Sequence, residues 1–156
     1  LVYLSNVDSE FIYLSSYDLN SKATSKILSF DWDIETIALS PQADKLAVVL
    51  NQDGILKLKL YTWPALEEIS VNSPDVGVTS FYDQVVFSPD GQNILFTHSS
   101  GENVSNIYCL DLAKNSLEIV SDNQLLIGHE DLVEPSLERY ESFDGLSVPY
   151  LLALCT

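Results

Sequence analysis

The two histidines of the sequence are the side chains best suited to act as a base or to bind a metal near neutral pH. His98 ends a predicted strand and precedes Ser99-Ser100-Gly101, so we interpret it as a solvated turn histidine. His129 lies within Gly128-His129-Glu130-Asp131, where imidazole and carboxylate groups could bind zinc. Zinc usually takes three or four protein ligands, and a single histidine beside two acids has no helical ligand spacing. We therefore interpret His129 as part of a polar linker.

Acidic turns are a second possible ion site. Asp31-Trp32-Asp33 and Asp53-Gly54 offer the oxygen ligands that calcium prefers. Neither follows the spacing of a calcium loop with its terminal Glu, so we expect surface turns there. Trp32, Trp63 and the eight tyrosines are suited to filling gaps between sheets, with exposed aromatic ligand platforms as the alternative. The sequence thus predicts no metal and no cofactor.

The sequence lacks the motif that holds the serine nucleophile of an α/β-hydrolase. The pentapeptide Gly-x-Ser-x-Gly, which holds a serine nucleophile on a strained strand-to-helix turn, does not occur. Cys109 lies in an apolar run and Cys155 near the last residue, a pattern that indicates neither a disulfide framework nor a cysteine-rich metal site. We predict no catalytic, cofactor-binding or metal-binding residue in this chain.

Composition favours a folded, acidic domain. Hydrophobic residues make up 46% of the 156 residues and charged residues 19%, a globular balance. Seven Lys and Arg against 23 Asp and Glu give a net charge of −16, which repels phosphate backbones and anionic membranes. We therefore expect neither a nucleic-acid partner nor a membrane. Because the sequence begins at Leu1 and contains no Met, we expect a fragment or a processed chain, whose compartment stays open.

Short apolar runs separated by Asn, Asp, Ser, Gly and Pro clusters predict strands and turns, and hence an all-β chain. The predicted strands cover residues 1–5, 11–17, 26–30, 35–39, 45–50, 56–62, 67–71, 83–87, 93–97, 106–110 and 116–120.

These strands form a repeat of 48 residues, the spacing between Ser40 and Ser88. Ile37-Ala38-Leu39-Ser40-Pro41 matches Val85-Val86-Phe87-Ser88-Pro89, and Leu58-Lys59-Leu60-Tyr61 matches Ile107-Tyr108-Cys109-Leu110. A unit of about 40 to 50 residues with four short strands is typical of one blade of a β-propeller. We predict two complete blades.

A third, truncated copy opens the chain. Leu1-Val2-Tyr3-Leu4 stands for the second strand of a blade, and Tyr17-Asp18-Leu19 corresponds to Leu110-Asp111-Leu112. The fold prediction is therefore two four-stranded blades plus part of another.

Turn residues support this register. Ser88-Pro89-Asp90-Gly91 places Pro where φ is near −65° and Gly where φ is positive, which joins the first and second strands. Asn51-Gln52-Asp53-Gly54 joins the second and third strands of the earlier blade in the same way. Ser40-Pro41-Gln42-Ala43 lacks both Asp and Gly, so this copy is degenerate or carries its acid one position late, at Asp44.

The run from Phe87-Ser88-Pro89-Asp90-Gly91 to Leu110-Asp111-Leu112 resembles the Ser-Pro-Asp-Gly propeller repeat. TolB-like periplasmic proteins share that repeat with the propellers of the prolyl oligopeptidase and acylaminoacyl peptidase family. The repeat is specific for the fold class and weak for function, because propellers host enzymes, ligand binders and docking scaffolds alike.

The segment after the last predicted blade separates these families. Glu138 to Leu151, with the turn Phe143-Asp144-Gly145, looks like the junction where bacterial oligopeptidases begin the first hairpin of their α/β-hydrolase domain. A hairpin of unrelated origin has the same spacing, but its position after the last blade fits the family. The resemblance implies a partial propeller at residues 1–127, a linker at 128–137 and the start of a truncated hydrolase domain at 138–156.

The resemblance implies that this chain is the non-catalytic propeller of a serine peptidase that admits short peptides, with its triad downstream of Thr156. Both histidines precede the hydrolase segment, so neither is the family's catalytic base. The expected partners are the downstream hydrolase domain and short peptide substrates, and the peptidase interpretation favours the cytoplasm. The alternative is a TolB-like scaffold that binds proteins or ligands without catalysis. Because incomplete propellers expose apolar faces and sheet edges, we also expect the isolated chain to self-associate.

Overall fold

The computed structural model describes residues 1–75, 77–79, 85–121, 123–124, 128 and 132–154. Among these residues it contains strands and turns and no helix, so the all-β prediction is confirmed. Consequently none of the described residues belongs to a helix that is long and apolar enough to cross a membrane.

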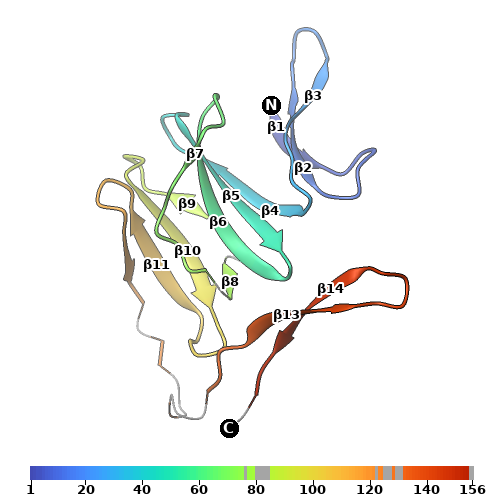
Figure 1. The fold of residues 1–156 in the computed structure, drawn as a ribbon. Coiled ribbons are helices and arrows are strands. Elements are labelled where there is room, and N and C mark those ends of the chain that lie inside the picture. The colour runs from blue at the N-terminus through green and yellow to red at the C-terminus, as the bar shows by residue number, and fades with distance from the viewer. Residues whose placement is uncertain (76, 80–84, 122, 125–127, 129–131, 155–156) are drawn as a thin grey trace.

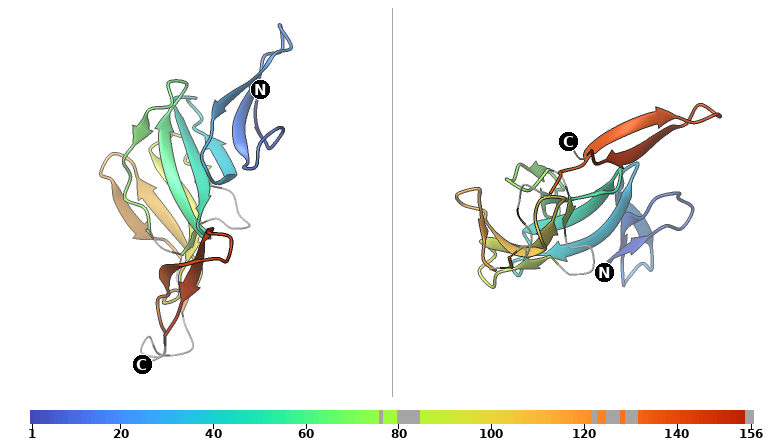
Figure 2. Two further views of the ribbon diagram at one scale, coloured as in Figure 1. Left: turned by 45° about the vertical axis from the view of Figure 1, so that its right-hand side comes forward. Right: turned by 90° about the horizontal axis from the view of Figure 1, so that it is seen from below.

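Three groups of antiparallel strands, which we call blades, follow one another along the chain and fan out side by side (Figures 1 and 2). The partial blade consists of β1 (Val2–Ser5), β2 (Tyr13–Tyr17) and β3 (Thr24–Leu28). The middle blade consists of β4 (Asp33–Leu39), β5 (Lys45–Gln52), β6 (Ile55–Thr62) and β7 (Glu68–Ile69). The last blade consists of β9 (Val86–Phe87), β10 (Asn93–Ser99), β11 (Asn106–Asp111) and β12 (Ser116–Ile119). A separate hairpin, β13 (Ser136–Glu141) and β14 (Ser147–Leu152), ends the described chain.

The sequence did not predict β8 (Val78–Thr79), which connects the middle and last blades. Val78 is the parallel partner of Leu56 in β6, and Thr79 is the antiparallel partner of His98 in β10. The two blades therefore share one hydrogen-bonded sheet of nine strands. Of the predicted strand 83–87, residues 83–84 lie outside the described residues and β9 begins at Val86.

The core consists of two apolar layers, one on each side of the middle blade. Leu46, Val48 and Leu50 of β5 pack in the layer shared with the partial blade. Ala47 and Val49, the residues between them, pack in the layer shared with the last blade. Successive side chains of a strand point to opposite faces, so a strand between two blades must be apolar throughout.

Trp32 and Trp63 pack against the layer between the partial and middle blades. Their predicted role as gap fillers is therefore confirmed. Both side chains remain partly accessible to solvent.

In the Ser-Pro turns of the two complete blades, the serine hydroxyl donates to an acidic side chain of the same turn. Ser88 Oγ donates to Asp90 Oδ1 at 2.6 Å, and Gly91 has a φ of 67°. In the earlier copy Ser40 Oγ donates to Asp44 Oδ1 at 2.8 Å. Asp44 thus supplies the missing acid, as in the second of the two alternatives, although it stands two positions after Gln42, the equivalent of Asp90, and not one.

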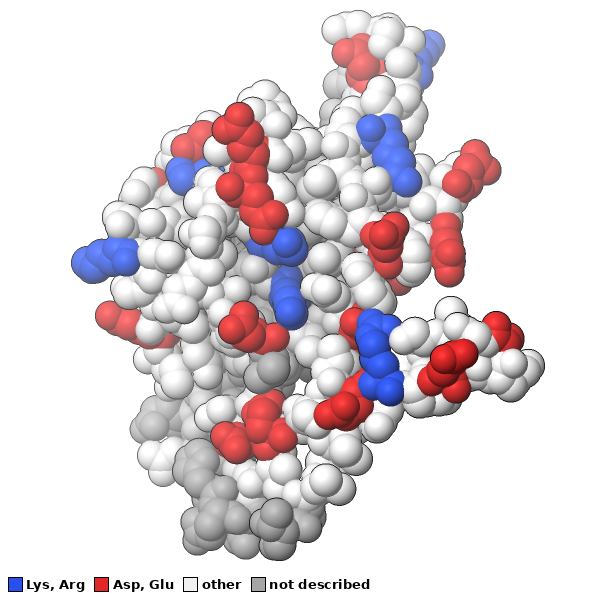
Figure 3. Space-filling model, in the orientation of Figure 1, with Lys and Arg blue, Asp and Glu red and all other residues white. Residues whose placement is uncertain are grey.

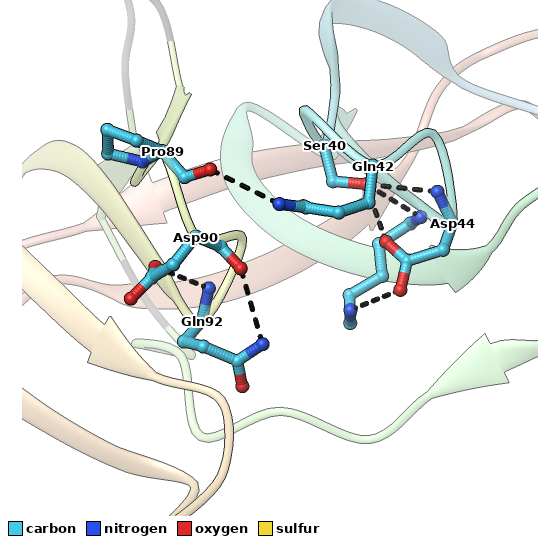
Figure 4. Close-up of polar contacts among 7 residues, drawn as sticks. Ser40, Gln42, Asp44, Pro89, Asp90 and Gln92 are labelled. Carbon is cyan, nitrogen blue, oxygen red and sulfur yellow. Dashed lines mark hydrogen bonds and ion pairs between the residues drawn. The ribbon is translucent and has the colours of Figure 1, made fainter.

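These two turns also contact each other. Gln42 Nε2 donates to the carbonyl oxygen of Pro89 at 3.2 Å, which links corresponding points of neighbouring blades (Figure 4). Gly91 lies beneath this side chain, so the contact leaves no room for a Cβ there without moving Gln42.

The outer face of the last blade has no covering sheet among the described residues. Leu95 is the register partner of both Val86 and Cys109, so these three side chains lie on one face of the sheet. Ile107 is two residues from Cys109 on β11, and its side chain therefore lies on the same face. Val86 is 52% exposed and Ile107 42%. In the middle blade Leu58, the repeat equivalent of Ile107, is only 3% exposed because the last blade covers it.

Candidate functional site

The hairpin β13–β14 projects from the blades and meets them at one end, near the β5–β6 turn and the β10–β11 loop (Figures 1 and 2). We call the surface formed by this turn and loop the blade end. It is the candidate functional site because it is where the propeller contacts the segment that follows it.

An ion pair joins the hairpin to the β5–β6 turn. Arg139 Nη2 lies 2.5 Å from Asp53 Oδ1, and the Asp53 side chain is only 8% exposed. Asp53 and Gly54 have φ values of 57° and 82°, those of a tight two-residue hairpin turn, which confirms the turn predicted at Asp53-Gly54. Arg139 Nη1 also donates to Ser147 Oγ on the opposite strand of the hairpin at 3.3 Å.

The linker crosses the β10–β11 loop at Gly101. A Cβ on Gly101 would lie 2.5 Å from the carbonyl oxygen of Val133 and from Cδ of Pro135, so only glycine allows this approach. The backbone N–H of Glu102 donates to Glu134 Oε2 at 3.3 Å. The linker therefore touches the blades before β13 begins at Ser136, two residues before the start of the predicted hydrolase segment.

A groove of about 190 Å³ separates the hairpin from the blade end. Leu137 and Leu151 line it from the hairpin and Ile55 from the blades, while Glu134 brings the one charge. Its remaining lining residues are Gly54, Gly77, Ser99, Ser100, Gly101 and Pro135. The hairpin thus lies over an apolar groove that it does not fill.

The expectation for His98 is wrong. His98 is 4% exposed inside β10 and is not a solvated turn residue. Its Nδ1 lies 3.0 Å from Thr79 Oγ1, and its ring meets the ring of Tyr108 edge-on at a centroid distance of 5.5 Å. The sequence prediction failed because β10 continues to Ser99 and because β8, the strand that pairs with β10 at His98, was not predicted.

His98 and Thr79 replace an apolar pair of the middle blade. In that blade Ile34 of β4 is the register partner of Leu50 in β5, and Leu50 precedes His98 by the repeat period of 48 residues. Ile34 and Thr79 are both 0% exposed. Burial lowers the pKa of His98 because desolvation disfavours the charged imidazole, and the nearby Glu134 carboxylate partly opposes this shift.

The acidic turns that the sequence analysis considered as ion sites and interpreted as surface turns have other contacts. Asp33 Oδ1 accepts a hydrogen bond from the backbone N–H of Ile12 at 2.6 Å, and Asp53 pairs with Arg139. His129 and Cys155 lie outside the described residues. Within the part of the chain that the structure describes, no three His, Cys, Asp or Glu side chains group in a way that could hold a metal ion.

Sequence reasoning missed the contacts at the blade end. Asp53-Gly54 was recognised as a turn, but nothing in the sequence pairs Asp53 with Arg139, which lies 86 positions later. Gly101 gave a weak signal, since a glycine after two serines reads as an ordinary loop.

Solved structures with the same fold include two peptidases. The puromycin-hydrolyzing peptidase of Mycobacterium tuberculosis is 16% identical with a TM-score of 0.77, over 97% of this chain and 24% of that chain. Prolyl oligopeptidase B from Galerina marginata is 15% identical with a TM-score of 0.74, over 95% of this chain and 21% of that chain.

TolB from Acinetobacter baumannii also shares the fold, at 21% identity and a TM-score of 0.63, over 92% of this chain and 33% of that chain. No protein-family model and no curated protein sequence matches the chain. The likeness to these structures establishes propeller blades, and this chain spans a third or less of the length of each of the three proteins.

Proposed function

We propose that this chain is the propeller part of a prolyl-oligopeptidase-type serine peptidase. Residues 1–127 contribute blades, residues 128–137 form the linker, and residues 138–156 begin an α/β-hydrolase domain. Two of the structures with the same fold are peptidases, and the likeness to them extends over 95% and 97% of this chain.

The observation that carries the proposal is the exposure of the hairpin β13–β14. Every residue of β13 is exposed, including Leu137 at 38% and Tyr140 at 55%. In β14, Tyr150 and Leu151 are 40% and 53% exposed. A two-stranded hairpin is marginally stable in water, and grouped apolar side chains favour burial against a partner. In the proposed parent, the hydrolase domain covers them.

In this proposal the chain itself performs no bond cleavage. The serine nucleophile on its Gly-x-Ser-x-Gly turn, the acid and the histidine all belong to the hydrolase domain. The propeller caps that domain and restricts entry to short peptides, and the blade end faces the hydrolase because the hairpin is attached there.

A TolB-like scaffold is the second candidate. TolB has a higher sequence identity to this chain than either peptidase, 21% against 15% and 16%. In that case the parent has no triad, and the propeller surface binds a protein or a ligand without catalysis.

The test is made on the full-length parent. We expect it to cleave a chromogenic peptide amide, and we expect substitution of the serine in its Gly-x-Ser-x-Gly to abolish turnover. The 156-residue chain alone should show no serine-dependent turnover. A parent without such a motif, or without serine-dependent cleavage, would favour the scaffold.

Capping is tested separately with one cleavage sequence presented in two forms. The parent should cleave it in a short free peptide and leave it intact within a folded protein. Equal cleavage of both would contradict a restrictive propeller while leaving the peptidase assignment in place.

A further inference from the structure

Arg139 is the only arginine in the chain, in a molecule with 23 acidic residues. Acidic side chains are spread over the face of the molecule shown in Figure 3, with few basic ones among them. Glu141, two residues along the same strand, lies on the same face as Arg139 and would be a local partner. The guanidinium instead contacts Asp53 on another element, whose side chain is nine-tenths buried.

Asp53 lies on a rigid support. Strands β5 and β6 pair without interruption from Lys45↔Thr62 to Gln52↔Ile55, and Asp53 occupies the turn that directly follows. Its backbone is left-handed, with a φ of 57°, a conformation that Asp and Asn tolerate better than most residues. The middle blade therefore fixes the backbone position of Asp53.

The other described contacts between the hairpin segment and the blades are looser. The linker contributes a single 3.3 Å hydrogen bond from Glu102 to Glu134 and the close approach at Gly101. Beyond the linker, Leu137 and Leu151 face the groove of about 190 Å³, which leaves space between hairpin and blades. Among the described residues, Asp53 and Arg139 form the one ion pair that joins the hairpin to a blade.

We propose that Asp53 and Arg139 form a salt-sensitive latch that sets the angle between the hairpin and the blade end. When the pair opens, the hairpin swings about the linker where it crosses Gly101, and the groove widens. The latch itself is independent of the proposed function. Its consequence for a following hydrolase domain, whose position it would set, rests on that proposal.

A protease specific for arginine tests the latch, because this chain offers it one cleavage site, after Arg139. A protease must draw the arginine side chain into its own pocket, so cleavage requires the ion pair to open. We expect Asp53→Asn to accelerate cleavage roughly three- to tenfold at low ionic strength. Added salt should accelerate cleavage of the unaltered chain and leave the variant nearly unchanged.

Asp8→Asn is the matched control. Asp8 has a φ of 54°, so this substitution removes the same charge at the same kind of backbone position, in another turn. It should leave the cleavage rate unchanged. Equal rates for the unaltered chain and the Asp53 and Asp8 variants would overturn the latch.

Ser147→Ala removes the side-chain partner of Arg139 within the hairpin, the hydroxyl to which Nη1 donates at 3.3 Å, and keeps the bond to the Ser147 carbonyl oxygen at 3.4 Å. We expect a smaller acceleration than for Asp53→Asn, and an equal or larger one would contradict the proposal. If cleavage of the unaltered chain did not respond to salt and Asp53→Asn lowered the urea midpoint, the faster cleavage of the variant would show unfolding of the turn and would equally contradict the latch. None of these outcomes depends on whether the parent is a peptidase.

Discussion

One position in each Ser-Pro turn has a left-handed backbone, and the residue type there determines the steric strain of the turn. Ala43 and Gly91 occupy equivalent positions, with φ values of 53° and 67°. Only glycine adopts this left-handed region without steric cost, because the Cβ of other residues approaches the following carbonyl oxygen. The middle blade therefore tolerates a strained residue that the last blade avoids.

Ala43→Gly should raise the free energy of unfolding by about 1 kcal/mol, because it removes this strain. Gly91→Ala should lower it by about 1 to 2 kcal/mol, because it introduces the strain and displaces Gln42. Urea unfolding of both variants measures the change. A loss of stability on Ala43→Gly would contradict the assigned backbone conformation.

Among the elements, β8 has the largest effect on its surroundings. It pairs with β10 at His98, which the sequence predicted as solvated and which is buried, and it supplies Thr79 as the hydrogen-bond partner of the imidazole. Periodicity could not find it, because a strand of two residues contains no repeat of apolar side chains. The longer strands were predicted because their alternating or continuous apolar runs are what a blade between two neighbours requires.

The His98–Thr79 pair makes stability depend on pH. Because the pKa of His98 is lowered in the folded state, the unfolded chain takes up its proton first as the pH falls through 6.5. The free energy of unfolding should therefore decrease below pH 6.5 and stop decreasing, as far as His98 contributes, below its folded pKa. Above that range His98 is neutral in both states and contributes no slope.

The double substitution His98→Leu with Thr79→Ile reproduces the Leu50–Ile34 pair of the middle blade and should remove this dependence. His98→Leu alone should cost about 1 to 3 kcal/mol relative to the double variant, because the buried Thr79 hydroxyl loses its partner. Urea midpoints measured from neutral pH to about pH 5 provide the comparison. Parallel curves for the double variant and the unaltered chain would refute the role of His98.

For the whole molecule, the outer face of the last blade matters most, because its apolar side chains are exposed to solvent. Leu58 and Ile107 are repeat equivalents, yet one is buried by the next blade and the other is exposed. The repeat in the sequence was sufficient to predict this stacking, because each blade buries its apolar faces against its neighbours. The blade end was not predictable in the same way, since its contacts join residues outside the repeat.

We expect the isolated chain to self-associate through this face, and Ile107→Asp to weaken the association. Phe143→Asp is the control, because Phe143 is 102% exposed in the turn between β13 and β14, and Figure 1 shows this turn on the opposite side of the molecule from β11. Sedimentation velocity at micromolar concentration measures the association of the unaltered chain and of both variants. A clean monomer of the unaltered chain would refute association, and a monomer obtained only with Phe143→Asp would move the interface to the hairpin.

The bridging strand β8 also bears on protein engineering. If the last blade were replaced by that of another protein with the crossover between β7 and β8, the foreign chain would supply β8. That strand would have to pair with β6 of this chain at Leu56 as well as with its own equivalent of β10 at His98. The partial and middle blades share no strand, so a crossover between Leu28 and Asp33 leaves every ladder intact. Recombination should therefore treat the middle and last blades as a single exchangeable cassette.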